Sequence, residues 1–273
     1  MQLTYLRTLA FGMLTAVSAA SAVQARTVCT ALADADSGKI LLQEGNCRDR
    51  VTPASTFKIA LSLIGFDSGF LQDARTPSLP YRAGDVDWGG EAWRQPTDAT
   101  RWMTYSVVWF SQRITHALGA PRVQKYLHNF NYGNADISGD PGKNNGLDRA
   151  WIGSSLTISP LEQIAFLQKL VRRELPVSAH AYDMTQQVVQ VNQLDNGWTV
   201  HGKTGTAFPH HADGSNDETR AHGWFVGWIT KGPRTLVFVR LTQREKKETT
   251  SAGIQTRDVL LSELPSLLAA KAN

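Results

Sequence analysis

The chain has 273 residues, a length that fits one large domain or two interleaved ones around a buried core. Hydrophobic residues make up 42% and charged residues 19%, which is the balance of a soluble globular protein rather than a disordered one. The formal net charge of +4 is mild and evenly spread, so no nucleic-acid partner is predicted.

The chain opens with an export signal. Arg7 precedes an apolar run at residues 8–23, and a Val-Gln-Ala sequence ending at residue 25 places small residues where a signal peptidase cuts. We therefore expect a signal peptide at 1–25, a mature chain from Arg26 and a periplasmic location. The alternative is a membrane anchor, but the apolar part of the run is short for a spanning helix. No membrane contact is expected once the signal is removed.

Both cysteines, Cys29 and Cys47, follow the expected cleavage site. In an oxidising compartment such a pair predicts a disulfide, with two buried free thiols as the alternative. Neither cysteine has a histidine near it in sequence, which argues against a catalytic role. The seven histidines form no metal-binding pattern such as His-Glu-x-x-His, so no metal is expected.

Taken in chain order, the patterns predict strands at both ends of the chain and helices between them. Runs rich in β-formers predict strands at 27–34 and 39–42, and an apolar periodic run predicts a helix from Ser55 to about Gly65. The chain is then mostly helical to about residue 195, and includes a helix opened by a capping box at residues 159–162. The last third predicts three strands and a closing helix, at residues 198–208, 222–229, 235–242 and 254–270. We expect the terminal strands to pair in one sheet, covered by helices.

The first candidate for catalysis is Ser55-Thr56-Phe57-Lys58. A serine hydroxyl needs an adjacent base, and residues at i and i+3 of a helix share one face, so the Lys58 amine can sit beside the Ser55 hydroxyl. At a helix start the backbone N–H of Ser55 is free to form half of an oxyanion hole. By itself the motif also fits a helix-capping serine with a surface lysine. It is, however, the only Ser-x-x-Lys in the chain, and it opens an apolar helix.

The second candidate is Lys203-Thr204-Gly205. The letters of residues 197–204 also match a nucleotide-binding P-loop, but the polar stretch that follows cannot start the helix that a P-loop requires. A strand edge is the better context, with Lys203 as a positive charge and glycines that permit close approach of a substrate. A plain strand with a hairpin is the alternative.

Three weaker patterns lie between these two, and their order is informative. They are Ser106-x-Val108, Tyr132-Gly133-Asn134 and Trp151. Together with Ser55-x-x-Lys58 and Lys203-Thr204-Gly205, the series resembles the class D serine β-lactamases, or oxacillinases, of the penicillin-recognising serine enzymes. The likeness covers almost the whole mature chain. Class A enzymes place Ser-Asp-Asn where this chain has Tyr-Gly-Asn.

The resemblance implies a fold. It is an α/β (α+β) architecture with a mostly antiparallel sheet flanked by helices and an inserted all-helical subdomain. One domain would span 26–273, with its sheet part at 27–54 and 196–273 and its helical part at 55–195. The sequence predicts no particular oligomeric state.

The resemblance also implies a chemistry. Ser55 would be acylated by a β-lactam, and Lys58, carboxylated by carbon dioxide or bicarbonate, would be the base, with no other cofactor. Trp151 would hold the carbamate and Ser106 would protonate the leaving nitrogen. Backbone N–H groups of Ser55 and Thr206 would form the oxyanion hole. The remaining implied contacts are the carboxylate-binding Lys203, Thr204 and Arg257, the substrate-binding Gly205, the apolar Val108 and Ile152, and Tyr132 on the site wall.

Two other functions share these motifs. One is a β-lactam-sensing receptor domain that is acylated without turnover, and the other is a cell-wall transpeptidase or carboxypeptidase. Such receptors carry membrane helices ahead of the domain, whereas only a signal peptide is expected here. Trp151 and the Tyr-Gly-Asn sequence favour the lactamase.

Overall fold

The structure is a computed structural model, which describes residues 25–211 and 213–270. The expected signal peptide lies outside these residues except for Ala25. No helix in the described ranges is both long and apolar enough to cross a membrane.

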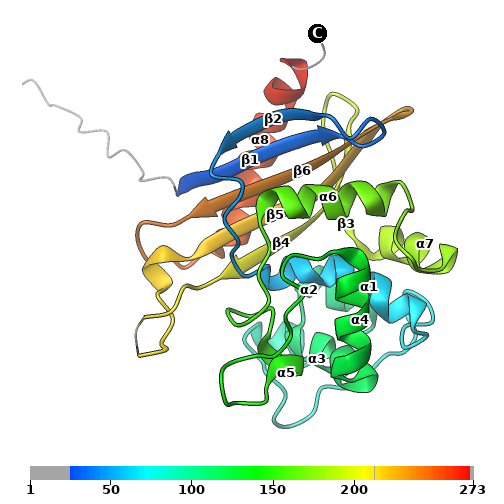
Figure 1. Cartoon of the computed structure of the whole chain (residues 1–273), viewed down its shortest axis with the longest axis vertical. Coiled ribbons are helices and arrows are strands. Elements are labelled where there is room, and N and C mark those ends of the chain that lie inside the picture. Colours follow the sequence, from blue (N-terminus) through cyan, green and yellow to red (C-terminus); the bar gives the residue numbers. More distant parts are fainter. Residues whose placement is uncertain (1–24, 212, 271–273) are drawn as a thin grey trace, which may run out of the picture.

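One six-stranded antiparallel sheet forms the upper part of the molecule, as Figure 1 shows. Its order is β2-β1-β6-β5-β4-β3. In chain order the strands are β1 Arg26–Asp34, β2 Ile40–Gly45, β3 Gln190–Gln193, β4 Thr199–Ala207, β5 His222–Lys231 and β6 Arg234–Gln243. The pairing of β1 with β6 joins the two ends of the chain in one sheet, so the predicted fold class is confirmed.

One strand differs from the prediction. β3 lies at residues 190–193, before the boundary of 196 that was expected for the sheet. Its sequence, Gln-Val-Asn-Gln, contains a single hydrophobic residue, and Val191 is 49% exposed. An edge strand with little burial gives no apolar signal, which is why sequence patterning misses it.

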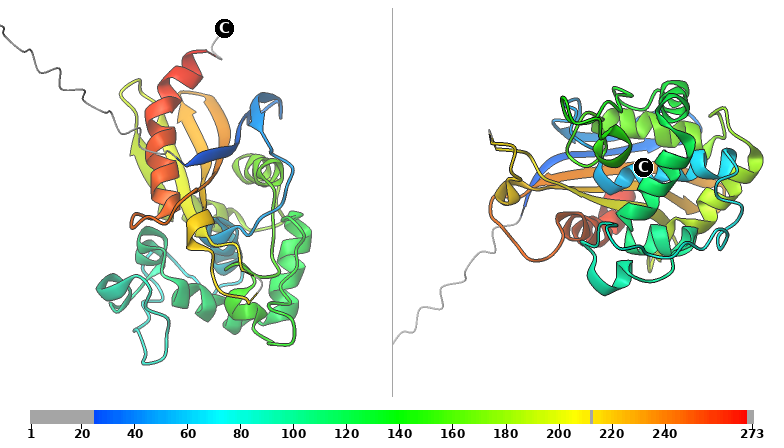
Figure 2. Two further views of the ribbon diagram at one scale, coloured as in Figure 1. Left: turned by 90° about the vertical axis from the view of Figure 1, so that its left-hand side faces the viewer. Right: turned by 90° about the horizontal axis from the view of Figure 1, so that it is seen from below.

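The helices cover both faces of the sheet. Figure 2 shows α8 on one face, with α6 and the helical region on the other. The helices are α1 Lys58–Asp67, α2 Ala99–Tyr105, α3 Val108–Leu118, α4 Ala120–Phe130, α5 Gly146–Arg149, α6 Pro160–Val171, α7 Ala179–Val188 and α8 Ala252–Ala269. Short 3₁₀ helices occur at η1 Ala54–Phe57, η2 Gly90–Trp93 and η3 Glu218–Arg220. The capping box predicted before α6 is present, with Ser159 accepting from the Glu162 N–H.

Strand alternation divides the interior into two cores. On β5, Trp224 and Val226 face the larger core beneath α1, α3 and α6, whereas Phe225 and Ile229 face the smaller core beneath α8. Successive strand residues point to opposite faces, so a strand buried on both sides reads as an almost continuous apolar run. This arrangement leaves the β4 edge of the sheet beside the start of α1, where the predicted motifs meet.

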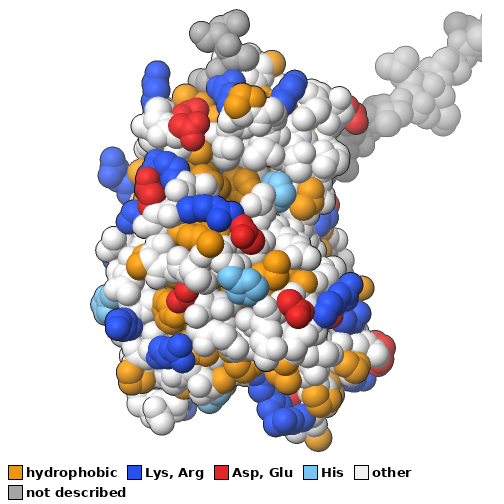
Figure 3. Space-filling view, turned by 90° about the vertical axis from the view of Figure 1, so that its right-hand side faces the viewer, with side chains coloured by type: hydrophobic (Ala, Val, Ile, Leu, Met, Phe, Trp, Pro, Cys, Tyr) orange, Lys and Arg blue, Asp and Glu red, His pale blue; other side chains and the backbone are white. Residues whose placement is uncertain are grey.

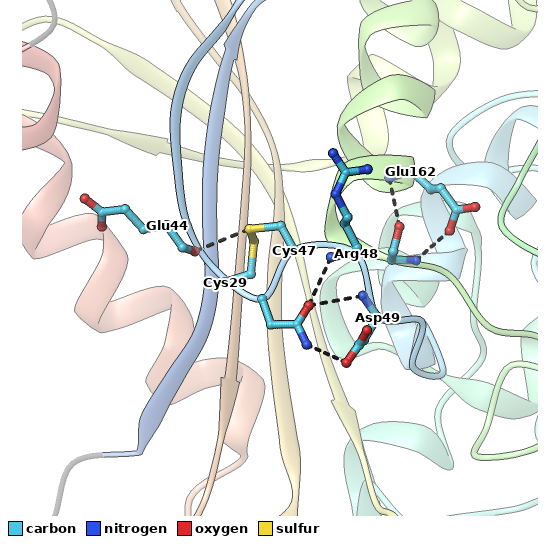
Figure 4. The surroundings of a disulfide bond; sticks show 8 residues. Cys29, Glu44, Cys47, Arg48, Asp49 and Glu162 are labelled. Carbon is cyan, nitrogen blue, oxygen red and sulfur yellow. Dashed lines mark hydrogen bonds between the residues drawn. A yellow bond between two sulfur atoms is a disulfide. The ribbon is translucent and has the colours of Figure 1, made fainter.

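The predicted disulfide is present and joins Cys29 of β1 to Cys47, which follows β2 (Figure 4). The Cys47 carbonyl also accepts a hydrogen bond of 3.1 Å from the Leu161 N–H, at the start of α6. A cross-link closing a loop of this size stabilises a fold by about 3 kcal/mol. The link therefore fixes the chain segment that leads into the Ser55 turn.

Charged side chains of both signs are interspersed with hydrophobic ones on the face shown in Figure 3. That face carries no continuous field of one sign, in agreement with the mild net charge of +4.

Candidate active site

A cavity of about 660 Å³ opens between β4, the start of α8 and the helical region. Most of the residues singled out in the sequence line it. They are Ser55, Ser106, Val108, Trp151, Ile152, Lys203, Thr204, Gly205, Thr206 and Arg257. Residues more than 200 positions apart in the chain thus surround one space.

Of the Ser55–Lys58 pair, Ser55 lines this cavity, whereas Lys58 does not line it and is buried next to Ser55. Lys58 Nζ donates a hydrogen bond of 3.2 Å to Ser55 Oγ. The first turn is the 3₁₀ helix η1 rather than α-helix, and Ala54, the first residue of η1, has a left-handed φ of +49°. The predicted helix therefore begins with a tighter turn, which still places the hydroxyl and the amine on one face.

Lys58 is completely buried. Burial lowers the pKa of its amine well below the usual lysine value, and the nearby positive charge of Lys203 lowers it further. Phe57 packs on the Trp151 indole with ring centroids 5.4 Å apart, which helps to close this side from water. A lowered pKa favours the neutral amine, which is the form that acts as a base or nucleophile.

Two buried polar atoms at the cavity have no hydrogen-bond partner within the described residues. One is Trp151 Nε1 and the other is Ser106 Oγ. Ser106 closes α2 with a left-handed φ of +60°, an uncommon conformation for a residue other than glycine. Buried polar groups without a partner are rare in folded proteins, and both of these line the cavity.

The β4 edge supplies the opposite wall. β3 pairs with β4 only as far as Gly202, so in the described structure the stretch Lys203–Ala207 has no strand neighbour on that side. Lys203 is buried at the cavity, and burial, together with the charge of Arg257, lowers its pKa to about 7. A substrate amide can therefore lie along an open strand edge beside a switchable positive charge.

Gly205 lets the nucleophile turn approach this strand. A Cβ at Gly205 would lie 3.0 Å from the Pro53 carbonyl oxygen and 3.2 Å from the Thr56 nitrogen, contacts tight enough that the neighbouring backbone would have to shift by a few tenths of an ångström. The sequence suggested that glycine here would admit a substrate, whereas the structure shows that it admits the turn carrying Ser55. Next to it, Thr206 Oγ1 accepts a hydrogen bond of 2.9 Å from the Gly253 N–H of α8.

Tyr132 is not on the cavity wall. It is fully buried, does not line the cavity, and packs between Phe57 and Phe166, with ring centroids 5.7 and 5.1 Å away. Its hydroxyl lies 3.5 Å from Nε2 of Gln163, which also donates to Thr56 Oγ1 at 3.0 Å. The expected wall position is therefore corrected, because Tyr132 supports the nucleophile turn from behind.

Sequence patterns also missed a brace for the Trp151 loop. Thr52 Oγ1 donates to the Trp151 carbonyl at 2.8 Å and accepts from the Gly153 N–H at 3.1 Å. The Thr52 carbonyl in turn accepts from Trp224 Nε1 on β5. No motif contains this threonine, and only its place three residues before Ser55 hints at a role.

Fold and site together define a serine acyl-transfer enzyme: a hydroxyl and a buried amine face a cationic strand edge. In keeping with this, the family model for the penicillin-binding protein transpeptidase domain matches residues 28–262. Within the described residues no cluster of His, Cys, Asp or Glu could hold a metal ion.

Similarities to named proteins identify the class of serine enzyme. Beta-lactamase OXA-9 of Klebsiella pneumoniae is 43% identical over 89% of this chain and 89% of its own, and beta-lactamase OXA-1 of Escherichia coli is 40% identical over 77% and 74%. The crystal structure of OXA-427 class D beta-lactamase is 47% identical, with a TM-score of 0.83 over 89% of this chain and 99% of that one. The chain belongs to the class D β-lactamases.

Proposed function

We propose that this protein opens the lactam amide of penicillin-type antibiotics through an acyl-enzyme on Ser55 and so confers resistance. The observation that carries the proposal is the 3.2 Å contact between Ser55 Oγ and the buried amine of Lys58, with Ser55 lining the same cavity as Lys203. Membership of the class D β-lactamases supports it independently.

Lys58 is the proposed base, in its carboxylated form. Only a neutral amine combines with carbon dioxide, and deprotonating an ordinary lysine at pH 7.4 costs roughly 4 kcal/mol. Burial and the charge of Lys203 reduce that cost by lowering the pKa of Lys58. The carboxyl group would supply an anionic base beside Ser55, and the partnerless Trp151 Nε1 is a fitting donor to hold it.

The remaining steps fall to residues around the cavity. The proton of the Ser55 hydroxyl leaves toward Lys58 as the oxygen attacks the lactam carbonyl. Backbone N–H groups of Ser55 and Thr206 stabilise the oxyanion. Ser106, whose hydroxyl has no hydrogen-bond partner in the described structure, relays the proton from carboxylated Lys58 to the leaving nitrogen, which restores both groups. A water activated on the Lys58 side then hydrolyses the Ser55 ester.

Substrate binding is assigned to the cationic side of the cavity. Lys203 and Thr204 of β4 and Arg257 of α8 would hold the carboxylate that β-lactams carry beside the lactam nitrogen, and Gly205 follows Thr204 on the strand. Val108 and Ile152 contribute apolar cover on the other side. The mature enzyme is proposed to begin after residue 25 and to act in the periplasm.

Steady-state turnover of benzylpenicillin and of a chromogenic cephalosporin tests the function. The wild-type enzyme is expected to release many equivalents of product per Ser55, and Ser55→Ala is expected to release none. A single stoichiometric burst without further turnover would instead identify a receptor or a transpeptidase. Ser262→Ala, an exposed serine of α8 outside the cavity, is the matched control and is expected to turn over normally.

A further inference from the structure

The mouth of the cavity is unusually apolar. In the described part of the chain, five large hydrophobic side chains are exposed, and three of them line this one cavity. These are Trp88, 60% exposed, Tyr105, 45% exposed, and Ile254, 37% exposed. Exposed apolar side chains that gather at a cavity mark a binding surface more often than scattered ones do.

The aromatic side of the mouth is built in layers. Trp88 packs against Trp93 with ring centroids 6.2 Å apart, and a Cβ at Gly89 would overlap the Trp93 indole, so the loop lies directly on that ring. Trp93 Nε1 donates a hydrogen bond of 2.8 Å to the Tyr105 carbonyl. The Arg101 guanidinium lies 4.5 Å from the centre of the Tyr105 ring. The backbone of Tyr105 and its ring are thus held in place, while the indole of Trp88 remains open to solvent.

The position of these residues indicates which half of the substrate they meet. Tyr105 immediately precedes Ser106, the group that faces the leaving nitrogen in the proposed mechanism. Ile254 stands three residues before Arg257 on α8, a spacing that places both on one helix face beside the substrate carboxylate. That carboxylate belongs to the ring attached to the leaving nitrogen. Tyr105 and Ile254 therefore border the leaving-nitrogen half of the substrate, and Trp88 lines the same cavity and is connected to Tyr105 through Trp93.

We propose that Trp88, Tyr105 and Ile254 form a subsite for a planar apolar substituent on the ring fused to the lactam. This subsite rests on the proposed β-lactam hydrolysis and specifies its substrate class. Cephalosporins carry such a substituent on the ring carbon next to the one that bears the carboxylate. A conjugated aryl group there can lie on the Trp88 indole, whereas a methyl group covers little of it.

Two cephalosporins with the same acylamino side chain test the subsite, one with a styryl-type substituent on the fused ring and one with methyl. In Trp88→Ala the ratio of kcat/KM for the styryl substrate to that for the methyl substrate is expected to fall about tenfold, mainly through KM. Trp88→Phe, which keeps a planar ring, is expected to recover most of the ratio. Ile40→Ala changes a comparably exposed hydrophobic residue away from the cavity and is expected to leave the ratio unchanged.

A second variant guards against a local folding defect. Ile254→Ala, on a different element, is expected to lower the same ratio about threefold, and thermal unfolding confirms that each variant is folded. If the ratio were unchanged in both Trp88→Ala and Ile254→Ala, the subsite would be overturned. The enzymatic function would still hold as long as the wild-type enzyme turns over benzylpenicillin. Failure of the wild-type enzyme to turn over benzylpenicillin would overturn the function itself, and the subsite with it.

Discussion

Gly253, near the start of α8, packs on Gly205 of β4 so closely that a Cβ at Gly253 would lie 2.5 Å from the Gly205 carbonyl oxygen. The Gly253 N–H donates to Thr206 Oγ1, and that hydroxyl is 2.7 Å from Ser251 Oγ. The start of α8 and the strand edge proposed for the oxyanion hole therefore share one rigid contact. A shift of the helix moves the Thr206 N–H with it.

Gly253→Ala is accordingly expected to weaken both the fold and the catalysis. The added methyl group would push α8 from β4, with an overpacking cost of about 1–3 kcal/mol in the free energy of unfolding. Displacement of an oxyanion N–H costs on the order of 100-fold in rate, so we expect kcat for benzylpenicillin to fall at least tenfold. Denaturant unfolding and steady-state kinetics measure the two effects. A variant that lost stability with kcat intact would show that this contact does not position Thr206.

Trp151→Phe tests the donor assigned to the Lys58 carbamate. Phenylalanine keeps the packing on Phe57 but removes the N–H, and a hydrogen bond to a charged group contributes about 1.5–3 kcal/mol. We expect the bicarbonate concentration for half-maximal carboxylation, followed by ¹³C NMR in labelled bicarbonate, to rise at least tenfold. Mild acid should lower the same signal, because protonation of the Lys58 amine blocks its reaction with carbon dioxide.

The control for this experiment is Trp102→Phe. Trp102 is also fully buried, but its Nε1 donates to Ser111 at 2.9 Å, so the substitution removes a structural hydrogen bond instead. It is expected to lower stability and leave the bicarbonate dependence as in the wild type. Equal bicarbonate titrations for Trp151→Phe and the wild type would exclude Trp151 as the donor.

Tyr132→Phe tests the corrected position of Tyr132. Its ring packing would be kept and only a 3.5 Å contact with Gln163 lost, so we expect a change of about 1 kcal/mol or less in stability. KM for benzylpenicillin should stay within about twofold of the wild-type value, because the side chain does not line the cavity. A tenfold rise in KM would return Tyr132 to the substrate-binding surface.

The parts of the site that the sequence predicted are the locally determined ones. Ser55 and Lys58 are three residues apart, and any helical turn brings them together, whether α or 3₁₀. The order of the motifs was enough to place Lys203 opposite them. The strands of the C-terminal third were predicted from their content of Val, Trp, Phe and Thr.

The parts that the sequence did not predict depend on contacts between distant segments. Thr52 acts through the carbonyl of Trp151, almost 100 residues away, and no spacing rule connects them. Tyr132 looked like a site residue because of its motif, but its burial is set by Phe57 and Phe166. The sequence indicated that another group approaches Gly205 closely. It did not indicate that this group is the backbone of the turn carrying Ser55.

His222, the first residue of β5, is expected to make the fold sensitive to acid. Burial, together with the charges of Arg220 and Arg26, lowers its pKa to about 4, against about 6.5 for an unfolded chain. Between pH 4 and pH 6.5 the unfolded state binds a proton at His222 that the folded state does not bind. The stability that neutral His222 contributes is therefore fully present above pH 6.5 and is lost as the pH falls toward 4.

Between pH 7.5 and 4.5 the wild type is therefore expected to lose about 2 kcal/mol more of its free energy of unfolding than His222→Gln does. Urea unfolding at the two pH values measures the difference, and His211→Gln, an exposed histidine of the β4–β5 loop, is the control that should behave like the wild type. The wild type and His222→Gln differ in no other titrating group. If both lost the same free energy of unfolding between pH 7.5 and 4.5, the proton that destabilises the fold would bind at a residue other than His222.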